Sequence, residues 1–226
     1  RGNHGLRFFY WSLQLVRNHM LRASTGIVSL VGSVSGTDDS GDFTITPLPA
    51  GISSGDIGVL IIGSATNESS LITTPTFTEL AHNANSGSAH ALVRTMDGTE
   101  TQVAITSGSN LSGTTYIFAV FRGCDEPSTL STATGASGMP NPGTSPTGVA
   151  ADWIIATGYL DDDDVTPTVQ TNYTLIDALG HTFIGAGSSS MMSYRTGVAG
   201  TDDPGVFGGG GTDEWVAYTI RLIKSA

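Results

Sequence analysis

The feature that most constrains this chain is a short run that is apolar on both sides of an extended backbone. The sequence TYIFAVFRG covers residues 115–123, and Tyr116 to Phe121 are all aromatic, β-branched or small and apolar. A strand with one wet face alternates apolar and polar residues, so this strand needs cover on both faces. A similar run, EWVAYTIRLI, occupies residues 214–223. We therefore predict that both runs are interior strands of sheets that are covered on each side.

These two runs belong to a set of four blocks that occurs twice in the same order, about 100 residues apart. The other blocks are PAGISSGDIGVLIIGSATN with PTGVAADWIIATGYLDD, TFTELA with NYTLIDA, and AHALVRTMDGTET with MMSYRTGVAGTDD. Aligning the blocks makes the following charged residues equivalent: Asp56 and Asp152, Arg94 and Arg195, and Arg122 and Arg221. The chain thus contains two pseudo-repeats, at about residues 49–123 and 146–226.

Composition favours short strands joined by turns over long helices. The chain has 30 glycines and only 13% charged residues, and glycine loses the most backbone entropy on folding. We predict an all-β fold: an antiparallel, jelly-roll-like β-sandwich over residues 27–226, in which strands of the two repeats interleave in two sheets. Two small sandwiches side by side are the alternative. The polar stretch 125–148 is expected to be a linker or an extended connection.

Residues 1–26 differ in character from the rest and are predicted to form an anchoring arm. Residues 1–37 contain four arginines and no acid (+4), while the whole chain carries −11, which leaves −15 on the remainder. The apolar spacing is that of an amphipathic helix. The residues expected to contact a partner are Leu6, Arg7, Phe8, Phe9, Tyr10, Trp11, Leu13, Val16, Arg17, Met20 and Arg22. Packing against another subunit is the preferred interpretation; a signal peptide, packing on the chain's own body and an expression artefact are the alternatives.

Several motifs together resemble a β-sandwich family of structural proteins in tailed bacteriophages. They are SGDIGVLIIGSATN, PTFTELA, LVRTMDGTETQVAI, YIFAVFRGCD, TSPTG and WVAYTIRLI, within about residues 49–226. Phe77 and Phe121 stand where that family usually has Trp and Tyr. The resemblance implies a virion component, such as a head decoration protein, a head fibre or a tail module. It also implies binding to the major capsid protein or other virion subunits, with a homo-oligomer, guessed to be a trimer, as the expected state.

The four arginines of the repeats are the main candidate site residues. Arg94, Arg122, Arg195 and Arg221 are expected at repeat-equivalent strand positions, in structural ion pairs with carboxylates such as Asp56 and Asp152. Ligand recognition is the alternative role.

Other candidates for chemistry are weaker. The run Asp161, Asp162, Asp163 and Asp164 could hold Ca²⁺, although a solvated loop is the simpler interpretation and no metal or cofactor is predicted. The histidines lack metal-ligand spacing, and Cys124, the single cysteine, has no neighbouring base in sequence.

The sequence therefore predicts a non-enzymatic protein of the virion, most simply a capsid decoration or cement protein anchored by its arm. A tail-fibre or lectin-like module that binds carbohydrate or a receptor is the second hypothesis, and a hydrolase on the same fold the third. The acidic body excludes nucleic-acid binding through its surface. No run approaches the roughly 18 apolar residues of a membrane-spanning helix.

Overall fold

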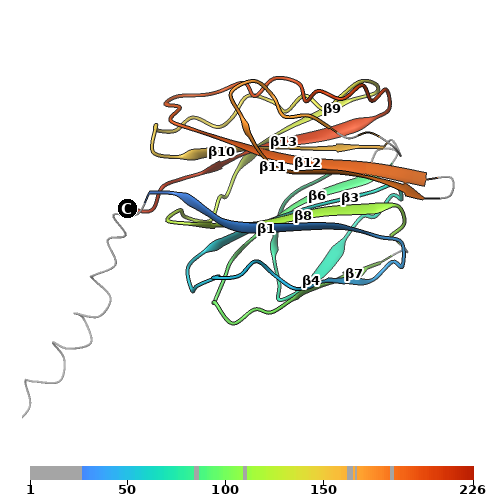
Figure 1. Ribbon diagram of the computed structural model, residues 1–226, viewed down its shortest axis with the longest axis horizontal. Coiled ribbons are helices and arrows are strands. Elements are labelled where there is room, and N and C mark those ends of the chain that lie inside the picture. The colour runs from blue at the N-terminus through green and yellow to red at the C-terminus, as the bar shows by residue number, and fades with distance from the viewer. Residues whose placement is uncertain (1–26, 84–86, 109–110, 162–164, 166, 184–185) are drawn as a thin grey trace, which may run out of the picture.

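The fold, seen in a computed structural model of the protein, is all β in the residues that the structure describes. These are residues 27–83, 87–108, 111–161, 165, 167–183 and 186–226. They form thirteen strands in three antiparallel sheets, stacked as layers in Figure 1. The predicted antiparallel β-sandwich is confirmed. No described helix is long and apolar enough to cross a membrane.

Sheet I contains five strands from the first repeat and the residues just before it. In spatial order they are β1 (Ser29–Asp38), β8 (Thr114–Arg122), β3 (Ile57–Ser64), β6 (Ser88–Thr95) and β5 (Thr78–Asn83).

Sheet II contains five strands from the second half of the chain in the corresponding order. They are β9 (Leu130–Gly135), β13 (Trp215–Leu222), β10 (Trp153–Leu160), β12 (Ala186–Thr196) and β11 (Thr174–Phe183). Each strand of sheet II thus has a counterpart of the same rank in sheet I. The predicted interleaving is wrong: sheet I contains only strands from residues 29–122 and sheet II only strands from residues 130–222. Each half of the chain supplies enough strands for a complete sheet, and the two sheets bury their apolar faces against each other. The polar stretch 125–148 also contains a strand, β9, which completes sheet II.

Sheet III covers the other face of sheet I. Its strands are β2 (Phe43–Ile45), β7 (Val103–Ser107) and β4 (Leu71–Thr74), with β7 in the middle. The second repeat keeps only a trace of this layer. The Phe207 amide donates to the Pro140 carbonyl at 2.9 Å, and an isolated bridge joins Thr168 to Gly208. Loops rather than a third sheet therefore cover the outer face of sheet II.

The main hydrophobic core lies between sheets I and II. Sheet I supplies β-branched and small residues such as Val59, Ile61 and Ala119, and sheet II supplies larger ones such as Tyr159 and Tyr218. A second core fills the space between sheets I and III. Strand β8 serves both cores, since Ile117 and Phe121 face sheet II while Phe118 and Val120 face sheet III. The predicted interior position of the run Tyr116–Phe121 is confirmed.

Two tyrosines of sheet II cross the main core and bond the backbone of sheet I. Tyr218 Oη donates to the Ala89 carbonyl at 2.7 Å, and Tyr159 Oη to the Ser64 carbonyl at 2.8 Å. Both rings are almost fully buried. The Tyr159 ring lies so close to Gly63 that a Cβ there would overlap it. The absence of a side chain at residue 63 therefore sets how closely the two sheets approach.

Replacing Gly63 with Ala should destabilise the protein by about 1–3 kcal/mol, because the added methyl group has to displace the buried Tyr159 ring. Urea unfolding followed by tryptophan fluorescence measures the loss. Gly143→Ala is the matched control, since a Cβ there meets its nearest atom at 3.6 Å, an ordinary contact. Equal stability of the two variants would contradict this account of the sheet contact.

Candidate functional site

The best-defined polar cluster surrounds Arg221 on β13, on the outer face of sheet II. Its side chain is 2% exposed, and its Nε donates to Asp152 Oδ2 at 3.2 Å. The guanidinium also donates to the carbonyls of Pro146, Val149, Val198 and Gly200, at 2.6–3.1 Å. One arginine thus holds the turn before β10 and the loop after β12 against the sheet.

Asp152 is fixed by the turn that precedes β10. Its Oδ2 accepts the Val149 amide at 2.9 Å and its Oδ1 the Lys224 amide at 3.0 Å. Burial alone raises the pKa of Asp152, but these amides and the Arg221 guanidinium outweigh it and hold the pKa below its ordinary value. The carboxylate is therefore ionised at neutral pH and committed to the fold.

Arg122 and Asp56 form the related pair at the end of β8, in a wetter setting. Arg122 Nη2 lies 2.7 Å from Asp56 Oδ2, and the Arg122 side chain is 48% exposed. Asp56 Oδ2 accepts the Ser53 amide at 2.8 Å, which repeats the bond between Val149 and Asp152. Asp56 and Asp152 therefore occupy the same place in equivalent turns.

The two arginines do not occupy equivalent positions, which corrects the sequence alignment. In sheet I Gly58 lies opposite Val120, whereas in sheet II the equivalent Ile154 lies opposite Arg221. Arg221 therefore sits two residues further into its sheet than Arg122 and points to the same face. This shift explains why Arg221 is buried under loops while Arg122 remains at the rim.

Arg94 and Arg195 are equivalent, as the alignment predicts, and each pairs with an acid of its own repeat. Arg94 Nε donates to Glu100 Oε1 at 3.3 Å, and Arg195 Nη1 to Asp202 Oδ1 at 2.8 Å. Neither acid is among the predicted partners. The signal was present, because both acids follow the arginine in the repeated motifs RTMDGTE and RTGVAGTD.

A shallow groove of about 660 Å³ lies beside the pair of Arg122 and Asp56. Its lining residues are Ser53, Ser54, Gly55, Asp56, Arg122, Gly123, Asp125, Ser225 and Ala226. It combines hydroxyl groups, two carboxylates and one half-exposed guanidinium, all of which can form hydrogen bonds to a polar ligand. Polar recognition is therefore the chemistry that these lining residues offer.

The histidine pair on β5 and β6 is a structural feature rather than a metal site. His90 is fully buried, its Nδ1 lies 2.6 Å from Glu79 Oε1, and its ring stacks on His82. Burial lowers the pKa of His90 below the ordinary 6.5, and the neighbouring Glu79 offsets this only in part. Among the described residues, no group of three His, Cys, Asp or Glu side chains is placed to hold a metal ion.

The single cysteine is a candidate nucleophile, and the aspartate run is a candidate calcium site. Cys124 is buried, and burial together with Asp125 and Asp56 raises the pKa of its thiol to about 12, so it is a poor nucleophile. The Asp161 amide donates to the Glu214 carbonyl at 2.9 Å. Asp162, Asp163 and Asp164 lie outside the described residues, as does the arm at 1–26, so the calcium and arm assignments stay predictions.

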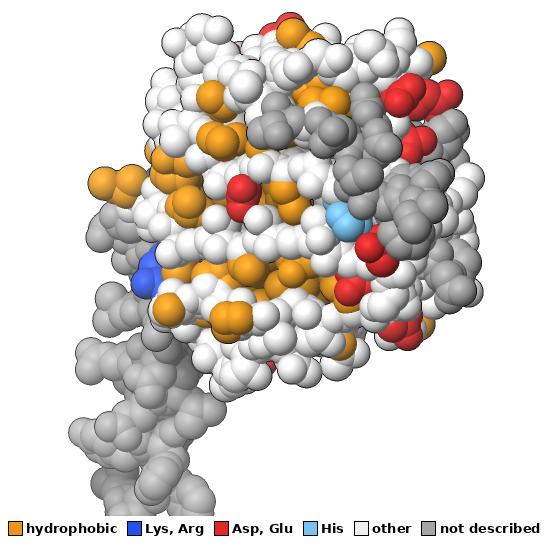
Figure 2. All heavy atoms as spheres, turned by 45° about the vertical axis from the view of Figure 1, so that its right-hand side comes forward, with side chains coloured by type: hydrophobic (Ala, Val, Ile, Leu, Met, Phe, Trp, Pro, Cys, Tyr) orange, Lys and Arg blue, Asp and Glu red, His pale blue; other side chains and the backbone are white. Residues whose placement is uncertain are grey.

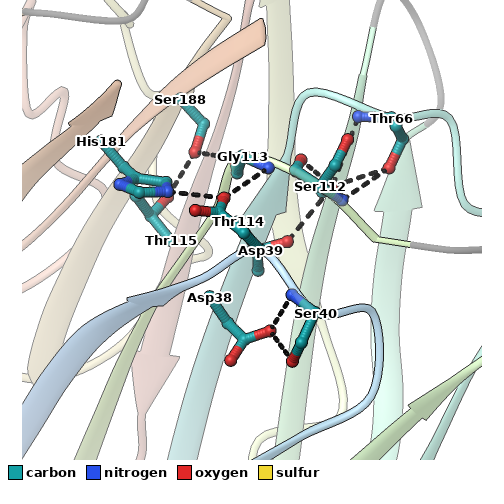
Figure 3. Close-up of polar contacts among 11 residues, drawn as sticks. Asp38, Asp39, Ser40, Thr66, Ser112, Gly113, Thr114, Thr115, His181 and Ser188 are labelled. Atoms are coloured by element: carbon teal, nitrogen blue, oxygen red, sulfur yellow. Dashed lines mark hydrogen bonds and ion pairs between the residues drawn. The ribbon is translucent and has the colours of Figure 1, made fainter. Parts of the chain in front are cut away.

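Hydroxyl groups tie sheets I and II together at one end of the main core (Figure 3). Thr115 Oγ1 of β8 lies 2.7 Å from Ser190 Oγ and 3.1 Å from Ser188 Oγ of β12. Nearby, Asp39 accepts the Gly113 amide at 3.2 Å and contacts His181 of β11 at 2.7 Å. These contacts join the two repeats, and no sequence pattern identified them.

Comparison with family models, with curated proteins and with solved structures finds no match to this chain. The candidate site is therefore interpreted from its own geometry.

Replacing Arg221 with Ala should cost about 3–5 kcal/mol of stability, because it leaves the buried Asp152 carboxylate without its cation and frees two loops. Arg122→Ala is the matched control and should cost about 1 kcal/mol, since water can reach its partner once the half-exposed side chain is gone. Urea unfolding of both variants measures the difference. Equal losses would contradict the assignment of Arg221 as the principal loop anchor.

Stability should fall as the pH drops below about 6.5, in part because of His90. The unfolded chain takes up a proton on this residue near pH 6.5, whereas the folded protein resists protonation to a lower pH. The contribution of His90 to the free energy of unfolding is therefore complete above pH 6.5. It declines below that pH, by up to about 1.4 kcal/mol per pH unit. His90→Asn, whose amide can still donate to Glu79, should flatten the curve of unfolding free energy between pH 7 and 5. An unchanged slope would contradict this prediction.

Proposed function

We propose that the protein is a non-enzymatic structural component of a tailed-phage virion, most simply a capsid decoration protein anchored by residues 1–26. The observation that carries the proposal is that the four arginines of the repeats bond groups of the chain itself. All four donate to carboxylates of the chain itself, and Arg221, Arg122 and Arg94 also hold its own backbone carbonyls. Side chains that could have recognised a substrate instead stiffen the body.

The distribution of charge supports an anchoring role for the first 26 residues. They carry four arginines and no acid, whereas the body carries all 20 acids against five cations. A basic segment rich in aromatic residues on an acidic body suits attachment to a separate protein surface. The resemblance of its motifs to phage β-sandwich proteins supports a subunit of a capsid or tail as the partner that carries this surface.

A second candidate function rests on the groove beside Arg122. Its hydroxyl groups, carboxylates and half-exposed guanidinium could bind a glycan or another polar receptor group, as a tail-fibre module would. A glycan array probed with the full chain and with Arg122→Ala separates the two functions. Binding that depends on Arg122 would favour the receptor-binding role.

Deleting residues 1–26 should leave the body folded but prevent its incorporation into particles. Circular dichroism and thermal unfolding test the fold, and quantitative mass spectrometry of particles purified from the phage that encodes the chain tests incorporation. Arg7→Glu combined with Arg17→Glu keeps the length of the segment and should reduce incorporation through charge alone. Undiminished incorporation of the deletion variant would contradict the anchoring role.

A further inference from the structure

Strands β1 and β11 lie on the same side of the body and run parallel to each other. They are the edge strands of sheets I and II, and each is ten residues long. Ser35 Oγ of β1 donates to Asp177 Oδ2 of β11 at 2.5 Å, and His181 contacts Asp39 at 2.7 Å. Both contacts join residues 142 apart in sequence, so the chain is in step over residues 35–39 and 177–181. We call this surface the β1–β11 side.

The β1–β11 side has few of the features with which sheets usually protect their edges, since each strand contains one bulge-like register shift but no basic residue or proline. Within the described residues, no strand pairs with the outer edge of β1 or β11. Neither strand contains lysine, arginine or proline, the residues that commonly block edge pairing. The edge strands on the opposite side, β5 and β9, have only six residues each. The two longer edges, which contain no Lys, Arg or Pro, therefore lie together on one side.

This side is also apolar, and the formal charges on its two strands are negative, with Arg122 of the neighbouring β8 opposite the first residue of β1. Leu30, Val31 and Val34 of β1 are half-buried, and Leu175 of β11 is 43% exposed. Figure 2 shows bands of hydrophobic side chains across this face, with few charges between them. The charged residues of the two strands are Asp38 and Asp177, and Asp39 follows directly. A partner that matches this side should be apolar and basic.

Residues 1–26 have this chemistry and the required length. The apolar positions run from Leu6 to Met20 at helical spacing, which spans about 22 Å as a helix. Beyond its bulge, β1 extends from Gly32 to Asp38, or about 24 Å. An amphipathic helix of this length can cover the two edges, with its arginines near the aspartates.

The point at which the segment joins the body favours a neighbouring molecule as the receiver. Val28 is 1% exposed and Ile27 is 83% exposed, so the chain enters the body just before β1. To lie along its own β1, the segment would have to turn back on itself within residues 21–27, whereas a neighbouring molecule can receive it without such a turn. We propose that the β1–β11 side binds residues 1–26 of a second copy of this chain. The proposal rests on the anchoring role given above and names the anchored partner as another copy.

Mass photometry of the full chain should show an oligomer, and deletion of residues 1–26 should leave only the monomer. Leu175→Glu places a charge on the receiving side and should weaken association at least tenfold. Ile72→Glu, on an exposed β4 residue that is 67% accessible, is the matched control and should leave association unchanged. A monomeric full chain, or equal effects of the two substitutions, would overturn the proposal.

Crosslinking identifies which molecule receives the segment. A photoreactive residue, Trp11→p-benzoylphenylalanine, is introduced into the full chain, and ¹⁵N-labelled and unlabelled chains are mixed before irradiation. Peptides from β1 or β11 should be crosslinked to the segment with mixed isotope labels. Crosslinks confined to one label would overturn exchange between copies. Incorporation of a monomeric chain into particles through residues 1–26 would retain the proposed function while rejecting this inference.

Discussion

Burial of β8 on both faces is the constraint on which the rest of the structure depends. A strand with Ile117 and Phe121 on one face and Phe118 and Val120 on the other loses hydrophobic stabilisation unless both faces are covered. Sheet III, from the same repeat, covers one face. Sheet II covers the other face, so the second repeat completes the core of the first.

The two repeats meet this constraint by different means on their outer faces. The first repeat places Val120 beneath a complete third sheet, while the second places Arg221 at the equivalent position beneath loops. Loops expose backbone carbonyls that need donors, and a buried guanidinium supplies several at once. In the first repeat, the hydrogen-bonded strands of sheet III cover the outer face of sheet I. In the second repeat, the hydrogen bonds of Arg221 hold loops over the outer face of sheet II instead. The ion pair with Asp152 allows that charge to be buried.

The structural use of these polar side chains is relevant to the proposed function. Polar groups of the body that could recognise a ligand are largely used to hold turns and sheet ends, which suits a rigid structural module. The surface that we propose for association is the β1–β11 side, where two edges are long and their strands are apolar and acidic. A basic segment on each molecule and an acidic side on its neighbour would allow reciprocal exchange in a two-fold dimer, or head-to-tail binding that closes a ring of copies.

The sequence by itself determined the fold class, the presence of two repeats and the interior position of the run Tyr116–Phe121. These follow from local patterns, because burial on both faces and repeated turns leave a direct signature in residue order. It also indicated Asp56 and Asp152 as partners of the repeat arginines, but not which arginine each would pair with. Only the tertiary structure decided that each repeat forms its own sheet, that the polar segment 130–135 is a strand, and that Arg221 lies two residues deeper than Arg122. Sheet composition and register depend on which distant segments pair, and a one-dimensional pattern does not encode that choice when several pairings would bury the same residues.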